Sequence, residues 1–156
     1  MNKNYKLETL KTEKIKRNFK LINSSYFSEI IYDKNRRFFD LYLNVGTNGV
    51  LENQTKTYNE LIDNLNEYLT KISEYIQTTY SKSEKKKAAE LNNKKLNIEV
   101  VQITENNKNF DAVIVCGKEY KNFGIFKKYI GIRTEIKNGQ ITTMERKTDT
   151  LKENLK

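Results

Sequence analysis

The clearest pattern of apolar and polar positions lies in the middle of the chain. From Tyr58 to Tyr80, apolar residues recur every three or four positions, which is the spacing of one broad helical face. Thr57 followed by Glu60 has the spacing of a capping box, in which two side chains satisfy backbone N–H groups at a helix start. The pattern therefore predicts a long amphipathic helix over Tyr58–Tyr80. After a short break, a second helix is expected over Glu84–Asn93.

Alternating apolar and polar residues predict strands on both sides of this helix. Two strands are expected before it, over Tyr26–Tyr32 and Arg37–Val45. Four more are expected after it, over Leu96–Thr104, Asn109–Cys116, Gly124–Ile136 and Gln140–Glu145. In the second strand, alternation places Phe39, Leu41, Leu43 and Val45 on one face and Phe38, Asp40, Tyr42 and Asn44 on the other.

Strands that are grouped and joined by hairpins favour an antiparallel sheet with a helix on one face. Asn138-Gly139 is the strongest hairpin signal, because both residue types tolerate positive φ. We therefore predict a single α+β domain over residues 1–156, with the order ββ-α(α)-ββββ and an antiparallel sheet packed on one long helix. Within it, residues 1–22 fit either helix or strand, and residues 147–156 are expected to form a frayed tail.

Composition removes several classes of chemistry. The chain has 156 residues, no His and one Cys. Histidine bases, Ser-His-Asp triads and imidazole metal sites are therefore excluded, as are intramolecular disulfides and zinc sites built from several cysteines. We expect no catalytic residues, no metal site and no cofactor, and a protein that is not an enzyme. The lack of His leaves open an enzyme that uses Lys, Tyr or carboxylates, and we rank this alternative last.

Two groups of reactive side chains have a structural interpretation. Cys116 shares an alternating face with Ala112 and Ile114, so we expect a small buried hydrophobe rather than a nucleophile. Four carboxylates on the long helix are expected on its solvated side rather than in a metal site. They are Glu60, Asp63, Glu67 and Glu74.

The chain is basic, with 29 Lys and Arg against 20 Asp and Glu. The excess is largest in residues 1–24 and 83–95, although acids are interspersed in both. A charge of this sign suits an acidic protein partner or a nucleic acid. The longest apolar run, Ala112–Cys116, is far shorter than the ~20 residues of a membrane helix, so we expect a cytoplasmic protein with no membrane contact.

Aromatic and basic residues are interleaved over 120–133. If this stretch is a strand, one face consists of Ile125, Lys127, Tyr129 and Arg133. The other, which should be the core face, consists of Phe126, Lys128, Ile130 and Ile132. The candidate partner-binding residues are Lys127, Tyr129, Arg133, Tyr120 and Lys121. An ordinary solvated sheet face is the favoured interpretation of this stretch, contact with another protein is the next, and single-stranded nucleic acid is the least favoured. For the chain as a whole we expect a protein-binding module, with a nucleic-acid-binding module as the alternative.

Three segments carry a resemblance. Residues 40–45, the helix over Tyr58–Tyr80 and the paired strands ending in 129–141 together resemble small α+β bacterial domains of uncharacterised families, some of which are taken to be immunity proteins. The resemblance implies a bacterial protein that acts by protein–protein contact, as an immunity or accessory factor, with a toxin as one class of partner. Many immunity proteins against nucleases are acidic, whereas this chain is basic. The oligomeric state is left open.

Overall fold

The computed structural model describes residues 20–22, 25–31, 38–44, 50–80, 96–105, 107–122 and 126–147. The predicted second helix and the predicted tail beyond Lys147 lie outside these ranges. The fold is α+β, as predicted. Its elements are β1 (Lys20–Ile22), β2 (Ser25–Ile31), β3 (Phe38–Asn44), α1 (Glu52–Thr79), β4 (Ile98–Ile103), β5 (Ala112–Asn122), β6 (Phe126–Lys137) and β7 (Gln140–Lys147).

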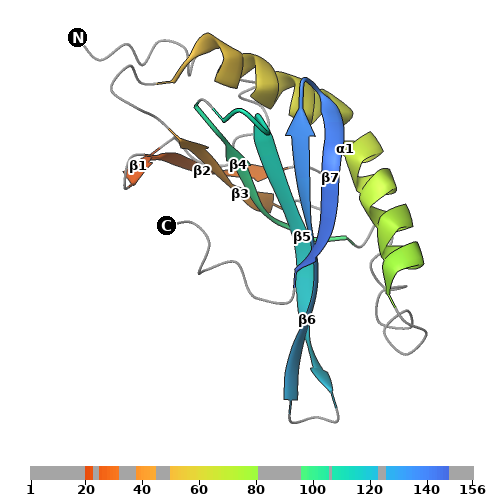
Figure 1. Ribbon diagram of the computed structural model, residues 1–156. Helices are drawn as coiled ribbons and strands as arrows, with labels where there is room; N and C mark the ends of the chain where they lie inside the picture. The colour runs from red at the N-terminus through yellow and green to blue at the C-terminus, as the bar shows by residue number, and fades with distance from the viewer. Residues whose placement is uncertain are drawn as a thin grey trace.

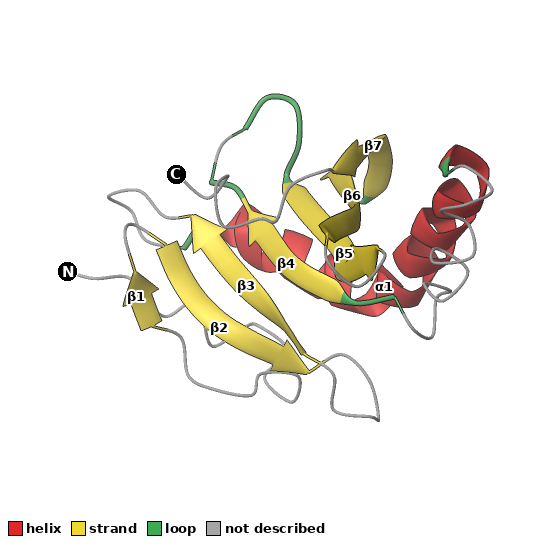
Figure 2. Cartoon of the chain, turned by 90° about the horizontal axis from the view of Figure 1, so that it is seen from below, coloured by secondary structure: helices red, strands yellow, loops and turns green. Residues whose placement is uncertain are grey.

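The strands form one seven-stranded sheet in which spatial order follows chain order from β1 to β7. Neighbours are antiparallel except β3 and β4, which run parallel with Tyr42 opposite Gln102. The prediction of a wholly antiparallel sheet is therefore wrong at this pair. The reason is α1, because a helix between two neighbouring strands carries the chain back to the same end of the sheet. Figure 2 shows α1 on one side of the strands.

The helix begins earlier than predicted. Its N-cap residue is Leu51, whose backbone N–H donates to Gln54 Oε1 at 2.9 Å. The Gln54 side-chain amide in turn donates to the Asn44 carbonyl at the end of β3. The predicted start at Thr57 and Glu60 is wrong, because Gln54 satisfies the helix start one and a half turns upstream.

The core lies between α1 and the sheet face that it covers, which we call the inner face. Phe39, Leu41 and Leu43, which share one face of β3 as predicted, are buried there. Cys116 is fully buried among the same side chains, which confirms the prediction of a small buried hydrophobe. The helix contributes an apolar stripe consisting of Tyr58, Leu61, Leu65, Tyr68, Leu69, Ile72 and Ile76.

The β6–β7 hairpin turns at Asn138-Gly139, as predicted. Both residues have positive φ, 49° and 71°, which is the geometry of a two-residue hairpin turn. The Tyr68 hydroxyl donates to the Gly139 carbonyl at 2.9 Å, so the middle of α1 is tied to this turn. The far edge of the sheet is therefore fixed relative to the helix.

Candidate binding surface

Strands β5 and β6 extend beyond both of their neighbours. β4 pairs with β5 only as far as Cys116, and β7 pairs with β6 only as far as Gly131. Beyond these points, five further residue pairs join Lys118–Asn122 to Phe126–Ile130. We call these two segments the β5–β6 arm. Figure 1 shows the arm projecting from the rest of the sheet.

No other strand in the described part of the chain pairs with either edge of the arm. This is unusual, because exposed strand edges present rows of backbone donors and acceptors that pair readily with other chains. A two-stranded ribbon is also only marginally stable by itself in water. A strand from another chain could therefore pair with an edge of the arm and stabilise it.

The arm is strongly basic. It contains four lysines and one glutamate, a net charge of +3 within ten residues. Three aromatic residues are interspersed with them. The charged and aromatic positions are Lys118, Glu119, Tyr120, Lys121, Phe126, Lys127, Lys128 and Tyr129.

The structure places four of the five predicted site residues on this arm. Lys121 lies opposite Lys127, and Tyr129 lies opposite Glu119. Tyr120 lies opposite Lys128, one register position away. Because alternate strand positions belong to opposite faces, Tyr120 is on the other face from Lys121, Lys127 and Tyr129. The arm thus brings basic and aromatic positions to both of its faces.

Arg133, the fifth predicted residue, lies in the body of the sheet. Its guanidinium is paired with the carboxylate of Glu135 and lies 3.4 Å from Glu145 Oε1. It also lies 5.3 Å from the centre of the Phe110 ring, within range of a cation–π interaction. Arg133 is thus held by its own chain at the base of the arm, and a partner would have to share it with these groups.

The predicted core face of this strand is confirmed for Ile130 and Ile132, whereas the side chains of Phe126 and Lys128 lie outside what the structure describes. Ile130 and Ile132 are 2% and 0% exposed and pack in the core cluster. Arg133 lies on the opposite face of the sheet, which we call the outer face. The alternation read from the sequence therefore assigns the two faces of β6 correctly.

Tyr80, just after α1, holds the base of the arm. Its hydroxyl donates to the Gly131 carbonyl at 3.0 Å and accepts from the Gly131 N–H at 3.1 Å. The Arg146 guanidinium lies over the Tyr80 ring, 4.3 Å from its centre. These contacts fix the end of the helix against β6 at the point where β7 stops.

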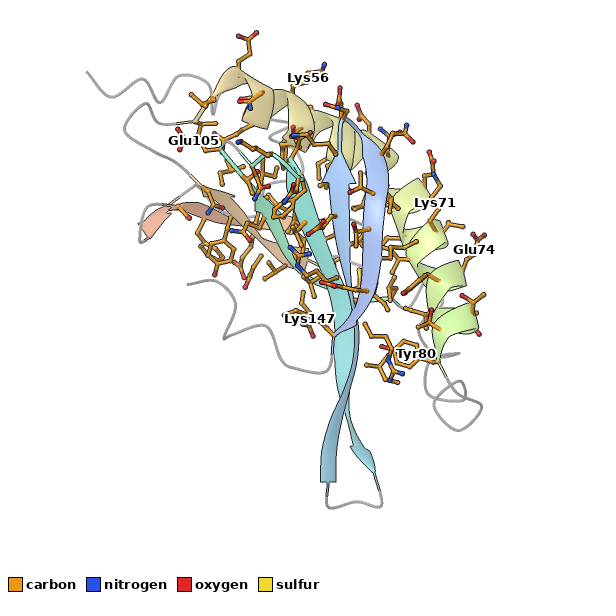
Figure 3. All side chains as sticks on the ribbon, viewed as in Figure 1. Lys56, Lys71, Glu74, Tyr80, Glu105 and Lys147 are labelled. Carbon is orange, nitrogen blue, oxygen red and sulfur yellow. The ribbon has the colours of Figure 1, made fainter. Side chains whose placement is uncertain are left out.

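Lys147 lies at the same point on the outer face, opposite Gly131 in register. Its Nζ is enclosed, and within the described ranges no acceptor lies within hydrogen-bonding distance of it. An enclosed ammonium without acceptors is costly, so it marks a place where an acceptor is needed. Figure 3 shows Lys147 and Tyr80 on opposite sides of the strands at the base of the arm. Sequence reasoning missed both residues, because no local pattern distinguishes them.

The other end of the outer face is acidic. Glu29 and Asp40 lie directly opposite each other on β2 and β3. Partial burial and the nearby charge of Glu29 raise the pKa of Asp40, and partial burial with the charge of Asp40 raises the pKa of Tyr42. The Phe27 and Tyr42 rings are in contact, with 5.2 Å between their centres. The outer face therefore carries a pair of carboxylates on β2 and β3.

A shallow groove of about 410 Å³ separates α1 from the edge strand β7. The lysine in its lining, Lys71, already forms an ion pair, because its Nζ lies 2.6 Å from Glu67 Oε1. Charges of both signs line the groove, so it has no preference for one kind of charged partner. Its lining consists of Lys71, Glu74, Tyr75, Thr78, Gln140, Ile141 and Met144.

The remaining reactive side chains occupy the places expected for them. Burial raises the pKa of the Cys116 thiol far above its usual value, with a smaller contribution from the charge of Glu99. A thiol that stays protonated is a poor nucleophile. Asp63, Glu67 and Glu74 are exposed on α1, and Glu60 is half-buried there beside Lys56. In the described part of the chain, no three carboxylate or thiol side chains are grouped as metal ligands.

Comparison of the chain with protein-family models, with curated proteins and with solved structures gives no match. Among the helices that the structure describes, none has the length and apolar character needed to cross a bilayer.

Proposed function

We propose that this chain is a protein-binding module whose contact element is the β5–β6 arm, and that it acts by contact rather than by catalysis. The observation that carries the proposal is the arm itself. It extends past β4 and β7 and concentrates a net charge of +3. An acidic partner surface complements that charge.

The chemistry of the arm supports a protein partner. The lysines of the arm alternate with three aromatic residues, Tyr120, Phe126 and Tyr129. Aromatic residues are enriched at protein interfaces, whereas lysine is depleted there. A mixture of both suits a partner that offers apolar as well as acidic groups. An immunity or accessory role in a bacterial cytoplasm, with a toxin as partner, is one specific form of this proposal.

A nucleic acid is the second candidate, and the shape of the arm is what favours it. The major groove of B-DNA admits a two-stranded β-ribbon, and lysines on such a ribbon neutralise phosphates. This candidate makes a distinct prediction, because every neutralised phosphate releases counterions. Affinity for DNA or RNA would then fall steeply as the salt concentration rises.

The test is affinity capture from the native host with the full chain as bait, divided into nuclease-treated and untreated halves. Two variants of equal net charge are compared with the parent chain. Lys127→Ser with Lys128→Ser removes charge from the arm, and Lys56→Ser with Lys71→Ser removes the same charge from α1.

The proposal expects one stoichiometric protein that survives nuclease treatment, is lost with the arm variant and is kept with the helix variant. Recovery that disappears after nuclease treatment favours the nucleic-acid candidate. Equal recovery of the same protein by both variants would contradict a role for the arm.

A further inference from the structure

We propose that the partner contributes an acidic, extended segment that adds as a strand to the β6 edge of the arm. This inference rests on the proposed function, since it specifies how the arm binds and what chemistry it recognises. Two observations support it: the direction of the backbone groups and the distribution of charge along the two edges.

The direction of the backbone groups follows from two contacts at the base of the arm. The Gly117 N–H donates to the Asn97 carbonyl at 3.1 Å, away from β6. Gly131, its register partner, directs its own N–H and C=O away from β5, to the Tyr80 hydroxyl. The pair Gly117–Gly131 is therefore one whose backbone groups point outward.

This alternation continues along the arm without a register shift. Every second pair shares the outward direction, so on β6 the N–H and C=O groups of Tyr129 and Lys127 point to the edge along which no described strand pairs. β7 ends opposite Gly131, one such position earlier. A strand added there would continue the ladder along β6 from the point where β7 leaves it.

The charge of the arm selects between its two edges. The β6 segment, Phe126–Ile130, contains Lys127 and Lys128 and no acid. The β5 segment, Lys118–Asn122, also contains two lysines, but it carries Glu119 at an outward-pointing position, so its net charge is +1 against +2 for the β6 segment. An added strand with acidic side chains is therefore favoured along β6, where like-charge contacts with Glu119 are absent.

The experiment is a selection of random displayed peptides against the full chain, followed by affinity measurement on the selected peptides. The diagnostic pair of variants is Lys127→Pro and Lys127→Val. Both lose the lysine charge, but only proline also removes the outward N–H. Proline is tolerated at such an edge position because that N–H takes no part in pairing with β5. Circular dichroism and melting of both variants verify that the fold is kept.

We expect the selected peptides to be acidic, with alternating apolar residues. Their affinity should fall roughly fivefold to tenfold further with Lys127→Pro than with Lys127→Val, because proline also removes one hydrogen bond. Peptides without acidic character, or equal affinity for the Pro and Val variants, would overturn strand addition. If binding depends on Lys127 and Lys128 but not on the outward N–H, strand addition is contradicted while the proposed function of the arm is supported.

If a different molecule binds the β6 edge, these experiments give different results. If a second copy of the chain covers the β6 edge, sedimentation shows a dimer that Lys127→Pro dissociates and Lys127→Val does not, and peptide addition is overturned. If duplex DNA displaces the selected peptides in a salt-dependent manner, the edge serves a nucleic acid. Peptides that are insensitive to every arm variant overturn both the inference and the proposed function.

Discussion

Asp111 illustrates how a single residue joins distant parts of this chain. Its carboxylate accepts from Lys137 Nζ at 2.7 Å and from the Asn138 N–H at 2.8 Å. Lys137 Nζ also donates to the Asn107 carbonyl at 3.1 Å, so the loop before β5 and the β6–β7 turn are held together. Partial burial alone would raise the pKa of Asp111. The hydrogen bonds from Lys137 and Asn138 and the charge of Lys137 outweigh it and lower that pKa.

Asp111→Asn should therefore destabilise the protein by about 1–3 kcal/mol at neutral pH, because it removes a charged acceptor of two donors. The folded-state pKa is lowered, so this stabilisation is fully present above the usual aspartate pKa and is lost as the pH falls through the folded-state value. Urea unfolding of parent and variant between neutral and strongly acidic pH measures the difference, which should shrink on acidification.

The exposed Glu74 provides the control, since Glu74→Gln should change the unfolding free energy by less than about 0.5 kcal/mol. A difference between parent and Asp111→Asn that stays constant with pH would show that the carboxylate charge is not what stabilises the turn.

Some of these residue-scale features can be read from the sequence and others cannot. Asn138-Gly139 predicts a hairpin turn, because few residue types adopt the positive φ values that such a turn requires. Cys116 can be assigned to the core because its alternation with Ala112 and Ile114 is local. The role of Asp111 is invisible, since its partners lie 26 and 27 residues later and only the fold brings them together.

At the scale of elements, α1 provides most of one side of the core. Ile72 is 0% exposed, so Ile72→Ala should cost about 2–5 kcal/mol through lost burial and the cavity that remains. Ile62 lies at the margin of the same face and is only half-buried, so Ile62→Ala should cost clearly less. Thermal or urea unfolding of the two variants measures this, and equal losses would show that the buried face of α1 is misplaced.

The end of α1 gives a second prediction at this scale. Tyr80→Phe removes the hydroxyl that serves both backbone groups of Gly131, leaving a buried donor and acceptor without a partner. The expected cost is about 1–3 kcal/mol in urea unfolding. Tyr75→Phe, at a half-buried site on the same helix, should cost less than about 0.5 kcal/mol. A neutral Tyr80→Phe would mean that Gly131 finds another partner in solution.

The elements themselves were largely predictable, but their limits and pairing were not. Periodicity identifies the helix and six of the seven strands, because each element has to bury one face. The start of α1 was missed because Gln54 caps it from within the helix rather than from the usual position before it. The parallel pairing of β3 with β4 was missed because it depends on where the chain goes after α1.

At the scale of the whole molecule, the arm is the main result that the sequence does not show. The aromatic and basic stretch is visible in the sequence, and four of the five candidate residues lie on the arm. That the stretch projects depends on where β4 and β7 stop pairing with β5 and β6. These end points are set by register and packing, so no local pattern contains them.

The most direct test of the arm as the binding element is hydrogen exchange of the full chain, free and saturated with the protein recovered in the capture experiment. Peptides that cover 118–130 should gain the largest protection on binding, whereas those from α1 should change little. Protection that appears on α1 or on the acidic end of the outer face, with the arm exchanging as in the free chain, would contradict the account.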